Sequence, residues 1–398
     1  MKLFWILWAG QLISQLGSGL TSFGLSVYVF RTTGSAFLVS MVALASFLPY
    51  LLLSVPSGVL SDRYDRRLLM VAGDGLSAVG VALILLAVSL DLPFIFIIIG
   101  ACISSAFSSL TDPAFRATVS DVLTKEEYAK AGGLNGLSSG VRFIICPLLS
   151  ALLLSFSSME LLLIIDILSF IPTIMAALSV RRRTQSRKNV DKVSLTTGFR
   201  ALYANKGLFV LVIYTSLITF FMGVIQILSE PMILSFSSVM TLSVAEVICA
   251  SGMVVSSLVI SGKGIKIGYR RALCFSLITS GLAMFAFGFT MSLFIIVPFG
   301  FVFFFSIPYA NTALDYLVRS NLERSAEGSI WGAVGFVSQT GYVFSYALSG
   351  LVSDSVAKAF DVSVGRGCAL VISGGGILLA LLALALLSFP SVRKLEHV

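Results

Sequence analysis

The chain is built from long apolar stretches that recur along almost its whole length. Each is about 20 residues or longer, the length that an α-helix needs to cross a hydrocarbon core of roughly 30 Å. Of the 398 residues 57% are hydrophobic and 12% are charged, a composition outside the range of water-soluble domains. The stretches do not alternate polar with apolar residues, which favours helices over a β-barrel. We therefore predict an all-α integral membrane protein with twelve transmembrane helices, approximately at 4–30, 36–60, 68–90, 94–115, 129–154, 160–180, 207–230, 241–261, 271–290, 293–315, 327–352 and 366–389.

The basic residues fix the expected orientation. An even number of spans puts both termini on one side, and if that side is cytoplasmic, 23 of the 27 Lys and Arg residues lie in cytoplasmic segments. Only Arg31, Lys358 and Arg366 lie outside, and Arg142 falls within a span. We expect a multi-pass protein of the plasma membrane with both termini cytoplasmic. The net charge of +8 then reflects topology, and no nucleic-acid partner is expected.

One long polar gap divides the chain into halves. Residues 181–206 hold eight basic residues and one acid, Asp191, and are expected to form a cytoplasmic linker near anionic lipid headgroups. The predicted domains are an N-terminal six-helix bundle at 1–180 and a C-terminal six-helix bundle at 207–398. A weak repeat supports two related halves, because the Pro, Ala and Gly at 113, 131 and 140 recur at 308, 326 and 335.

The most distinctive motif is the charged stretch Gly58-Val-Leu-Ser-Asp-Arg-Tyr-Asp-Arg-Arg67, which we expect to form a tight loop between the second and third spans. It resembles the signature loop of the major facilitator superfamily, with Asp65 where the family pattern has Gly; Asp is itself a common turn residue. The resemblance implies two pseudo-symmetric six-helix bundles. Further stretches resemble the macrolide-efflux branch, which includes siderophore exporters: Asp-Pro-Ala-Phe at 112–115, Lys-Glu-Glu-Tyr-Ala-Lys-Ala-Gly at 125–132, Asn-Lys-Gly-Leu-Phe at 205–209 and Ala-Glu-Val-Ile-Cys-Ala-Ser-Gly-Met at 245–253.

The signature stretch is expected to act as a cytoplasmic gate. Asp62 can accept hydrogen bonds from a helix N-terminus in the opposite half, where the helix dipole favours an anion. The neighbouring arginines can reach an acid such as Asp112 or Asp121. Together these contacts would hold the halves closed on the cytoplasmic side. The gate candidates are Gly58, Asp62, Arg63, Arg66, Arg67 and Asp112.

Four ionisable residues are expected inside spans, where charge is costly and usually functional: Arg142, Asp166, Glu230 and Glu246. An acid in an apolar surrounding can bind and release a proton, or hold a cationic substrate. The alternative is a static ion pair with Arg142. The resemblance matches Asp166 and Glu246 to acidic positions of the macrolide-efflux branch, and places Arg142 where a small residue is expected.

Polar residues at helical spacing indicate which face of a span turns towards a water-filled cavity. The cavity-lining candidates are Gln11, Gln15, Ser105, Asn135, Thr219, Gln226, Tyr309 and Tyr342. Such residues also serve helix–helix packing, and spacing does not separate the two roles.

No feature of the sequence indicates an enzyme. There is no Gly-x-x-x-x-Gly-Lys-Ser/Thr phosphate loop, the single histidine is His397, and the five cysteines lack metal or disulfide spacing. We expect no cofactor and no metal. The resemblance implies a secondary transporter, expected to be monomeric, that exports amphiphilic, drug- or macrolide-like molecules by alternating access, in exchange for protons. The alternatives are a siderophore or lipid exporter, and a non-transporting membrane subunit that serves a partner such as an ATPase.

Overall fold

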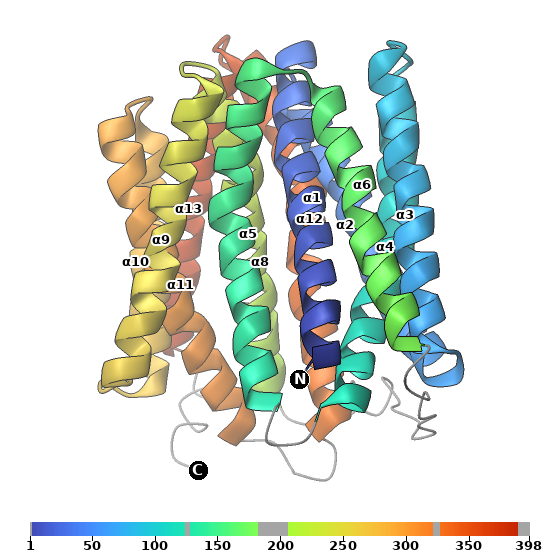
Figure 1. Ribbon diagram of the computed structural model, residues 1–398. Coiled ribbons are helices and arrows are strands. Elements are labelled where there is room, and N and C mark those ends of the chain that lie inside the picture. Colours follow the sequence, from blue (N-terminus) through green and yellow to red (C-terminus); the bar gives the residue numbers. More distant parts are fainter. Residues whose placement is uncertain (1, 124–127, 182–205, 321–326, 389–398) are drawn as a thin grey trace. The chain divides into compact units, whose positions relative to one another are not determined.

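A computed structural model describes residues 2–123, 128–181, 206–320 and 327–388. This part of the chain forms twelve helices and no strand, which confirms the predicted all-α fold (Figure 1). The helices are α1 (Lys2–Thr33), α2 (Ala36–Arg63), α3 (Arg66–Ser89), α4 (Ile95–Val122), α5 (Tyr128–Phe156), α6 (Met159–Arg181), α8 (Lys206–Leu234), α9 (Val239–Lys263), α10 (Tyr269–Phe289), α11 (Leu293–Ser320), α12 (Glu327–Ala359) and α13 (Val364–Ser388).

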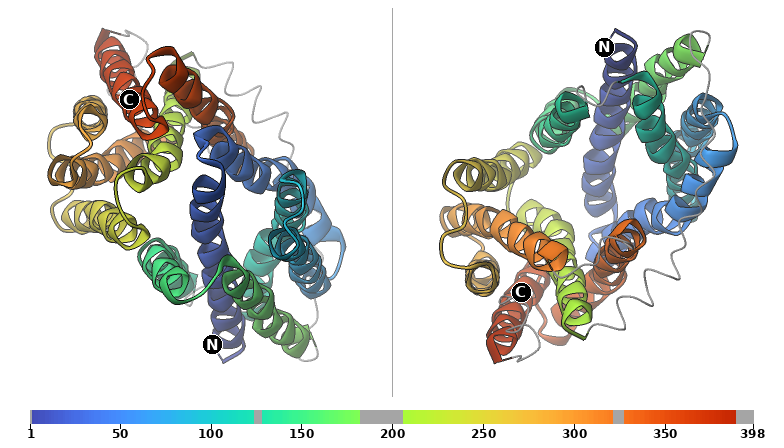
Figure 2. Two further views of the ribbon diagram at one scale, coloured as in Figure 1. Left: turned by 90° about the horizontal axis from the view of Figure 1, so that it is seen from above. Right: turned by 90° about the horizontal axis from the view of Figure 1, so that it is seen from below.

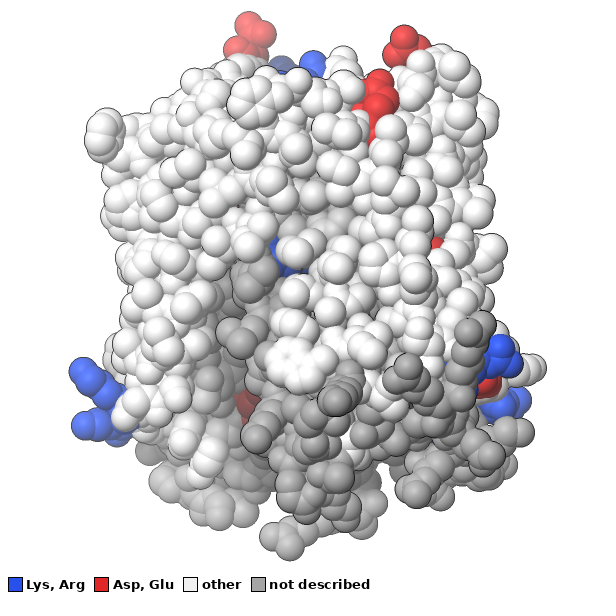
Figure 3. All heavy atoms as spheres, in the orientation of Figure 1, with Lys and Arg blue, Asp and Glu red and all other residues white. Residues whose placement is uncertain are grey.

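Nine of these helices are long and apolar enough to cross a membrane by themselves, judged on the described residues. The other three are α1, α5 and α12; they include the polar residues Gln11, Arg142 and Tyr342, and the described side chains of α5 and α12 begin only at Arg142 and Val334. In the face drawn in Figure 3, charged side chains gather near the helix ends and the middle is largely uncharged. This is the distribution expected where helices face lipid.

The chain divides into two compact units. Unit 1 comprises residues 1–32 and 41–191, and unit 2 comprises residues 33–40 and 192–398. The first residues of α2 therefore belong to unit 2, although the rest of α2 belongs to unit 1. Most of the predicted linker, residues 182–205, lies outside the described residues, so its place in the domain division stays a prediction.

The two units repeat the same helix pairings. In unit 1, α3 packs against α4 and α6, and in unit 2 the corresponding helix α10 packs against α11 and α13 (Figure 2). Glycines allow this close approach. A Cβ atom at Gly80 of α3 would come within 2.6 Å of the carbonyl oxygen of Gly100 of α4, and one at Gly281 of α10 would come within 2.7 Å of the carbonyl oxygen of Gly376 of α13. Small residues at such contacts are the usual means of packing helices in lipid.

Most of the signature stretch is helical, whereas the sequence predicted that the whole stretch forms a tight loop. Residues 58–63 are the last turns of α2, α3 begins at Arg66, and only Tyr64 and Asp65 lie between the helices. The prediction ended the helix where the apolar residues end, but a helix can continue past the hydrocarbon into the charged interface.

Candidate functional site

Asp65 forms the N-cap of α3. Its Oδ1 accepts a hydrogen bond from the backbone N of Arg67 at 3.1 Å, and its Oδ2 accepts one from Nε of Arg181 at 2.9 Å. Its φ of −65° is available to any residue, so the turn does not require the glycine of the family pattern. The aspartate at this position therefore serves as a helix cap and links the α2–α3 junction to the end of α6.

The arginines of the signature stretch lie in two environments. Arg66 and Arg67 are buried and Arg63 is exposed. The guanidinium of Arg66 donates to the carbonyl oxygens of Ser61, at 3.3 Å, and Ala117 of α4, at 3.2 Å. Arg66 thus ties the end of α2 to α4. The side chains of Asp62 and Asp121 lie outside the described residues, so the gate contact of Asp62 stays a prediction.

Asp112, the other acid expected at the gate, is held by α2. Its Oδ2 accepts a hydrogen bond from the Tyr50 hydroxyl at 2.5 Å. The backbone N of Tyr50 in turn donates to Oγ of Ser105 at 3.1 Å. Ser105, a cavity-lining candidate, is buried in this contact between α2 and α4. A Cβ at Gly58 would meet nothing within 4 Å, so this gate candidate is not a packing contact in unit 1.

Asp166 and Arg142 approach each other across unit 1 without forming an ion pair between these described residues. Asp166 is 1% exposed, and its Oδ1 accepts a hydrogen bond from Ser18 of α1 at 3.0 Å. Arg142 is exposed, and its side chain lies against Gly19 of α1, where a Cβ would meet its Nε at 3.2 Å. Its charge still acts on Asp166. The arrangement leaves the guanidinium available to a further group.

Unit 2 brings two of the predicted acids together. Glu230 of α8 and Glu246 of α9 are half-buried and close enough for their charges to act on each other. The charge of Glu230 also acts on Tyr346, whose hydroxyl donates to Oε1 of Gln226 at 3.2 Å. Tyr346 packs against Tyr342, with ring centroids 5.8 Å apart. Sequence reasoning missed Tyr346, although it lies four residues after Tyr342 and therefore on the same helix face.

The other cavity-lining candidates lie in four different helices, α1, α5, α8 and α11. Gln11 is buried, and its Oε1 has no hydrogen-bond partner among the described residues, whereas Gln15 is half-buried. The hydroxyl of Thr219 donates to the carbonyl oxygen of Ser338, which binds α8 to α12. Tyr309 packs against Phe305, and the side chain of Asn135 lies outside the described residues.

Asp74 of α3 is a buried acid that sequence reasoning overlooked. It is 2% exposed, and its Oδ1 accepts a hydrogen bond from Thr111 of α4 at 2.8 Å. Its position inside the apolar run 68–90 was the signal that could have revealed it. The described residues include no cluster of three or more metal-ligating side chains.

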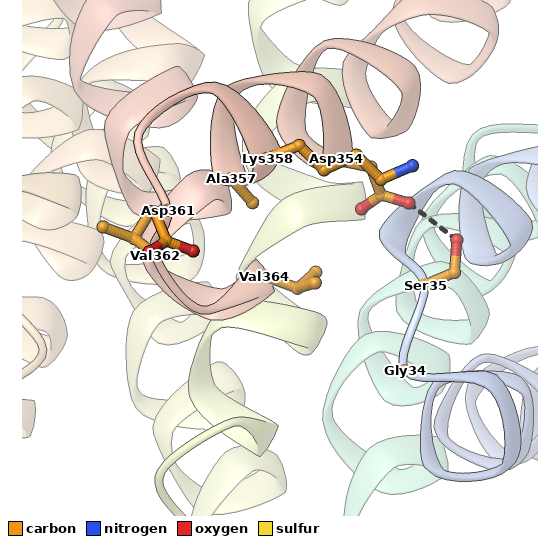
Figure 4. Close-up of a pocket in the computed structure, with 8 residues that line it drawn as sticks. All are labelled: Gly34, Ser35, Asp354, Ala357, Lys358, Asp361, Val362 and Val364. Carbon is orange, nitrogen blue, oxygen red and sulfur yellow. Dashed lines mark hydrogen bonds between the residues drawn. The ribbon is translucent and has the colours of Figure 1, made fainter.

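A cavity of about 390 Å³ in unit 2 lies beside the start of α2 (Figure 4). Asp354 of α12 lies at the edge of this cavity and caps the N-terminus of α2. Its carboxylate accepts hydrogen bonds from Oγ of Ser35 at 2.7 Å and from the backbone N of Ala36 and of Phe37, each at 3.2 Å. Lys358 and Asp361 also line the cavity.

Comparison with known proteins agrees with the resemblance noted in the sequence. The family model described as Major Facilitator Superfamily matches residues 7–346. Macrolide efflux protein A of Streptococcus pyogenes is 26% identical over 368 residues, covering 89% of this chain and 90% of that protein.

Two solved structures have the same fold. The nucleoside transporter NupG superposes with a TM-score of 0.76 at 15% identity, covering 98% of this chain and 100% of NupG. A bacterial homolog of the human lysosomal transporter Spinster superposes with a TM-score of 0.74 at 14% identity, covering 99% of this chain and 98% of that one. At such low identity these structures support the fold alone.

Proposed function

The chain belongs to the Major Facilitator Superfamily, and on that premise we propose that it exports amphiphilic, cationic small molecules by alternating access in exchange for protons. Family membership makes it a multi-pass membrane transporter rather than an enzyme. Its relatives named for macrolide efflux support the direction and the kind of substrate. The distribution of basic residues supports cytoplasmic termini.

The acid pair in unit 2 carries this proposal. Because Glu230 and Glu246 act on each other's charge, two negative charges there are unfavourable in a medium of low dielectric constant. The pair is stabilised by one bound proton or by one cation. A proton and a cationic substrate would therefore compete for the same place, which is what exchange requires. Gln226 and the rings of Tyr342 and Tyr346 add polar and apolar contacts for an amphiphilic molecule.

In alternating access the protein opens first to one side of the membrane and then to the other. The signature stretch would take part in the change between these two states. Arg66 anchors the end of α2 to α4, and Asp65 anchors the start of α3 to α6, so the α2–α3 junction moves as one body with unit 1. We propose that Asp62, at the end of this anchored helix, makes the releasable contact with the other half. Arg63, which is exposed, would take part.

A reconstituted transport assay tests the exchange. The purified chain alone is placed in liposomes, and accumulation of a fluorescent cationic dye is followed under an imposed pH gradient. We expect gradient-dependent accumulation in the wild type and its loss in Glu246→Gln. Glu160→Gln, which removes an acid from the first turn of α6, is the matched control and should leave accumulation intact. Accumulation that persists in both Glu246→Gln and Asp166→Asn would contradict the coupling role of these acids.

Arg142 favours a second candidate function, the export of an anion such as a siderophore or a lipid headgroup. Its guanidinium is exposed in the middle of α5, and the described residues give it no ion pair. In the same liposomes, an anionic fluorescent substrate replaces the dye. Transport of the anion that is lost in Arg142→Gln would favour this candidate over cation export. If the purified chain moves neither substrate, it serves a partner instead.

A further inference from the structure

Asp74 lies where four helices of unit 1 meet. Thr111 of α4 donates to its Oδ1 at 2.8 Å. The adjacent Gly73 marks a close approach of the two helices, since a Cβ there would come within 3.1 Å of the carbonyl oxygen of Phe107. On the other side is Thr173 of α6. The carboxyl group is therefore enclosed by packed helices.

The hydrogen bonds around Asp74 suit a neutral acid better than an anion. Its Oδ2 is buried and accepts no hydrogen bond in the described residues. The hydroxyl of Thr173 lies near enough to interact with Asp74, but it has a single hydrogen, which it donates to the carbonyl oxygen of Gly10 in α1 at 2.8 Å. The oxygen of Thr173 can still accept. A proton on Oδ2 would thus find an acceptor nearby, whereas a negative charge there would have to compete with the Gly10 carbonyl oxygen for the one hydrogen of Thr173.

The surrounding charges point the same way. The charged groups that act on Asp74 are Asp112 of α4 and Asp166 of α6, and both are acids. No Lys or Arg among the described residues forms an ion pair with it; the arginines of its own helix, Arg66 and Arg67, lie two turns away. An unpaired buried carboxylate costs several kcal/mol, and such a group binds a proton instead.

We propose that Asp74 is a proton-binding site of unit 1, which holds a proton on Oδ2 while α3, α4 and α6 are packed as described and releases it when these helices part enough to admit water. The proton comes from water and returns to water, and no bond other than O–H forms or breaks. The contacts of Thr111, Thr173 and Gly10 link the site to α4, α6 and α1. Proton occupancy would thereby favour one packing of unit 1 over another. As a step in transport, this inference rests on the proton exchange proposed above.

Infrared spectroscopy of the purified protein at neutral pH tests the site directly. A protonated carboxyl group has a C=O stretching band distinct from that of a carboxylate. We expect such a band in the wild type, its loss in Asp74→Asn, and its retention in Glu246→Gln. In Thr111→Val the band should move to higher wavenumber, because the hydrogen bond to the carbonyl oxygen is removed. An unchanged band in Asp74→Asn, in protein that elutes as the wild type does in size-exclusion chromatography, overturns the proposal. So does an unchanged band position in Thr111→Val.

Transport measurements separate this proposal from the function on which it rests. In liposomes, Asp74→Asn should keep dye exchange in the absence of a gradient but lose gradient-driven accumulation by about tenfold or more. Gradient-driven accumulation that survives in Asp74→Asn overturns the role in transport. If dye accumulation by the wild type does not depend on the pH gradient, the proposed proton exchange is refuted. The infrared bands would still report whether Asp74 binds a proton.

Discussion

The cap that Asp354 places on α2 makes a stability prediction that can be worked out from its contacts. Three donors, the Ser35 hydroxyl and two backbone N–H groups, point at one carboxylate at distances between 2.7 and 3.2 Å. Replacing Asp354 with Ala removes a cap and a favourable charge at a helix N-terminus. Loss of such a cap costs about 1 kcal/mol, and loss of the charge about 0.3–1 kcal/mol. We therefore expect the free energy of unfolding of unit 2 to fall by about 1–2 kcal/mol.

Unfolding can be followed with a dye that fluoresces on reaction with thiols. Cys249, Cys274 and Cys368 of unit 2 are buried and form no disulfide, so they react only when the unit opens. For a unit of this size, the expected loss lowers the midpoint of the thermal transition by about 2–8 °C. Asp354→Asn keeps an acceptor oxygen, so its midpoint should fall by less than half as much.

Asp361→Asn is the matched control, because it removes one negative charge from the same cavity without touching the cap. Asp361 has a φ of 51°, a conformation that Asn tolerates, so this substitution adds no backbone strain. Its midpoint should equal that of the wild type. If Asp354→Ala unfolds at the wild-type midpoint, or no lower than Asp361→Asn, the cap does not stabilise unit 2 and the reasoning fails.

Three other substitutions test the packing and the gate. Gly80→Leu should prevent folding, because its Cβ would meet the carbonyl oxygen of Gly100 at 2.6 Å, whereas Gly75→Ala, in open space, should elute as the wild type does in size-exclusion chromatography. Asp65→Ala should lower the unfolding free energy by about 1 kcal/mol in the thiol-dye assay, and Asp65→Asn by clearly less; equal losses would exclude a role as a cap. Asp62→Asn should increase labelling of single cysteines from the cytoplasmic side, and unchanged labelling would rule out the gate.

The sequence predicted the helices well because a membrane span is a local property. About 20 consecutive apolar residues suffice, and no distant contact is needed to recognise them. The helix ends were predicted less well. Residues 58–63 looked like a loop because they open a stretch with five charged residues, yet they continue α2. The next helix begins at the N-cap formed by Asp65, which sequence reasoning noticed only as a departure from a family pattern.

The candidate site was predicted in part, and the failures share a cause. Glu230 and Glu246 were found because charge inside an apolar run is visible in the sequence. The partners of Asp74 and Asp354 were not, because Thr111 lies 37 residues from Asp74 and Ser35 lies 319 residues from Asp354. The contact of Arg66 with the carbonyl oxygen of Ala117 was not predicted either, because a backbone acceptor leaves no trace in a sequence.

Counting the donors around each carboxyl group separates two kinds of acid in this protein. Asp354 receives three hydrogen bonds and lies at a helix N-terminus, an environment that stabilises a negative charge and suits a fixed structural contact. Asp74 receives one, is more deeply buried, and has only acids for charged neighbours. A transporter that carries protons needs groups of the second kind, since a carboxylate surrounded by donors would not take up a proton readily. The same count can be applied to any buried acid of a membrane protein before its titration is measured.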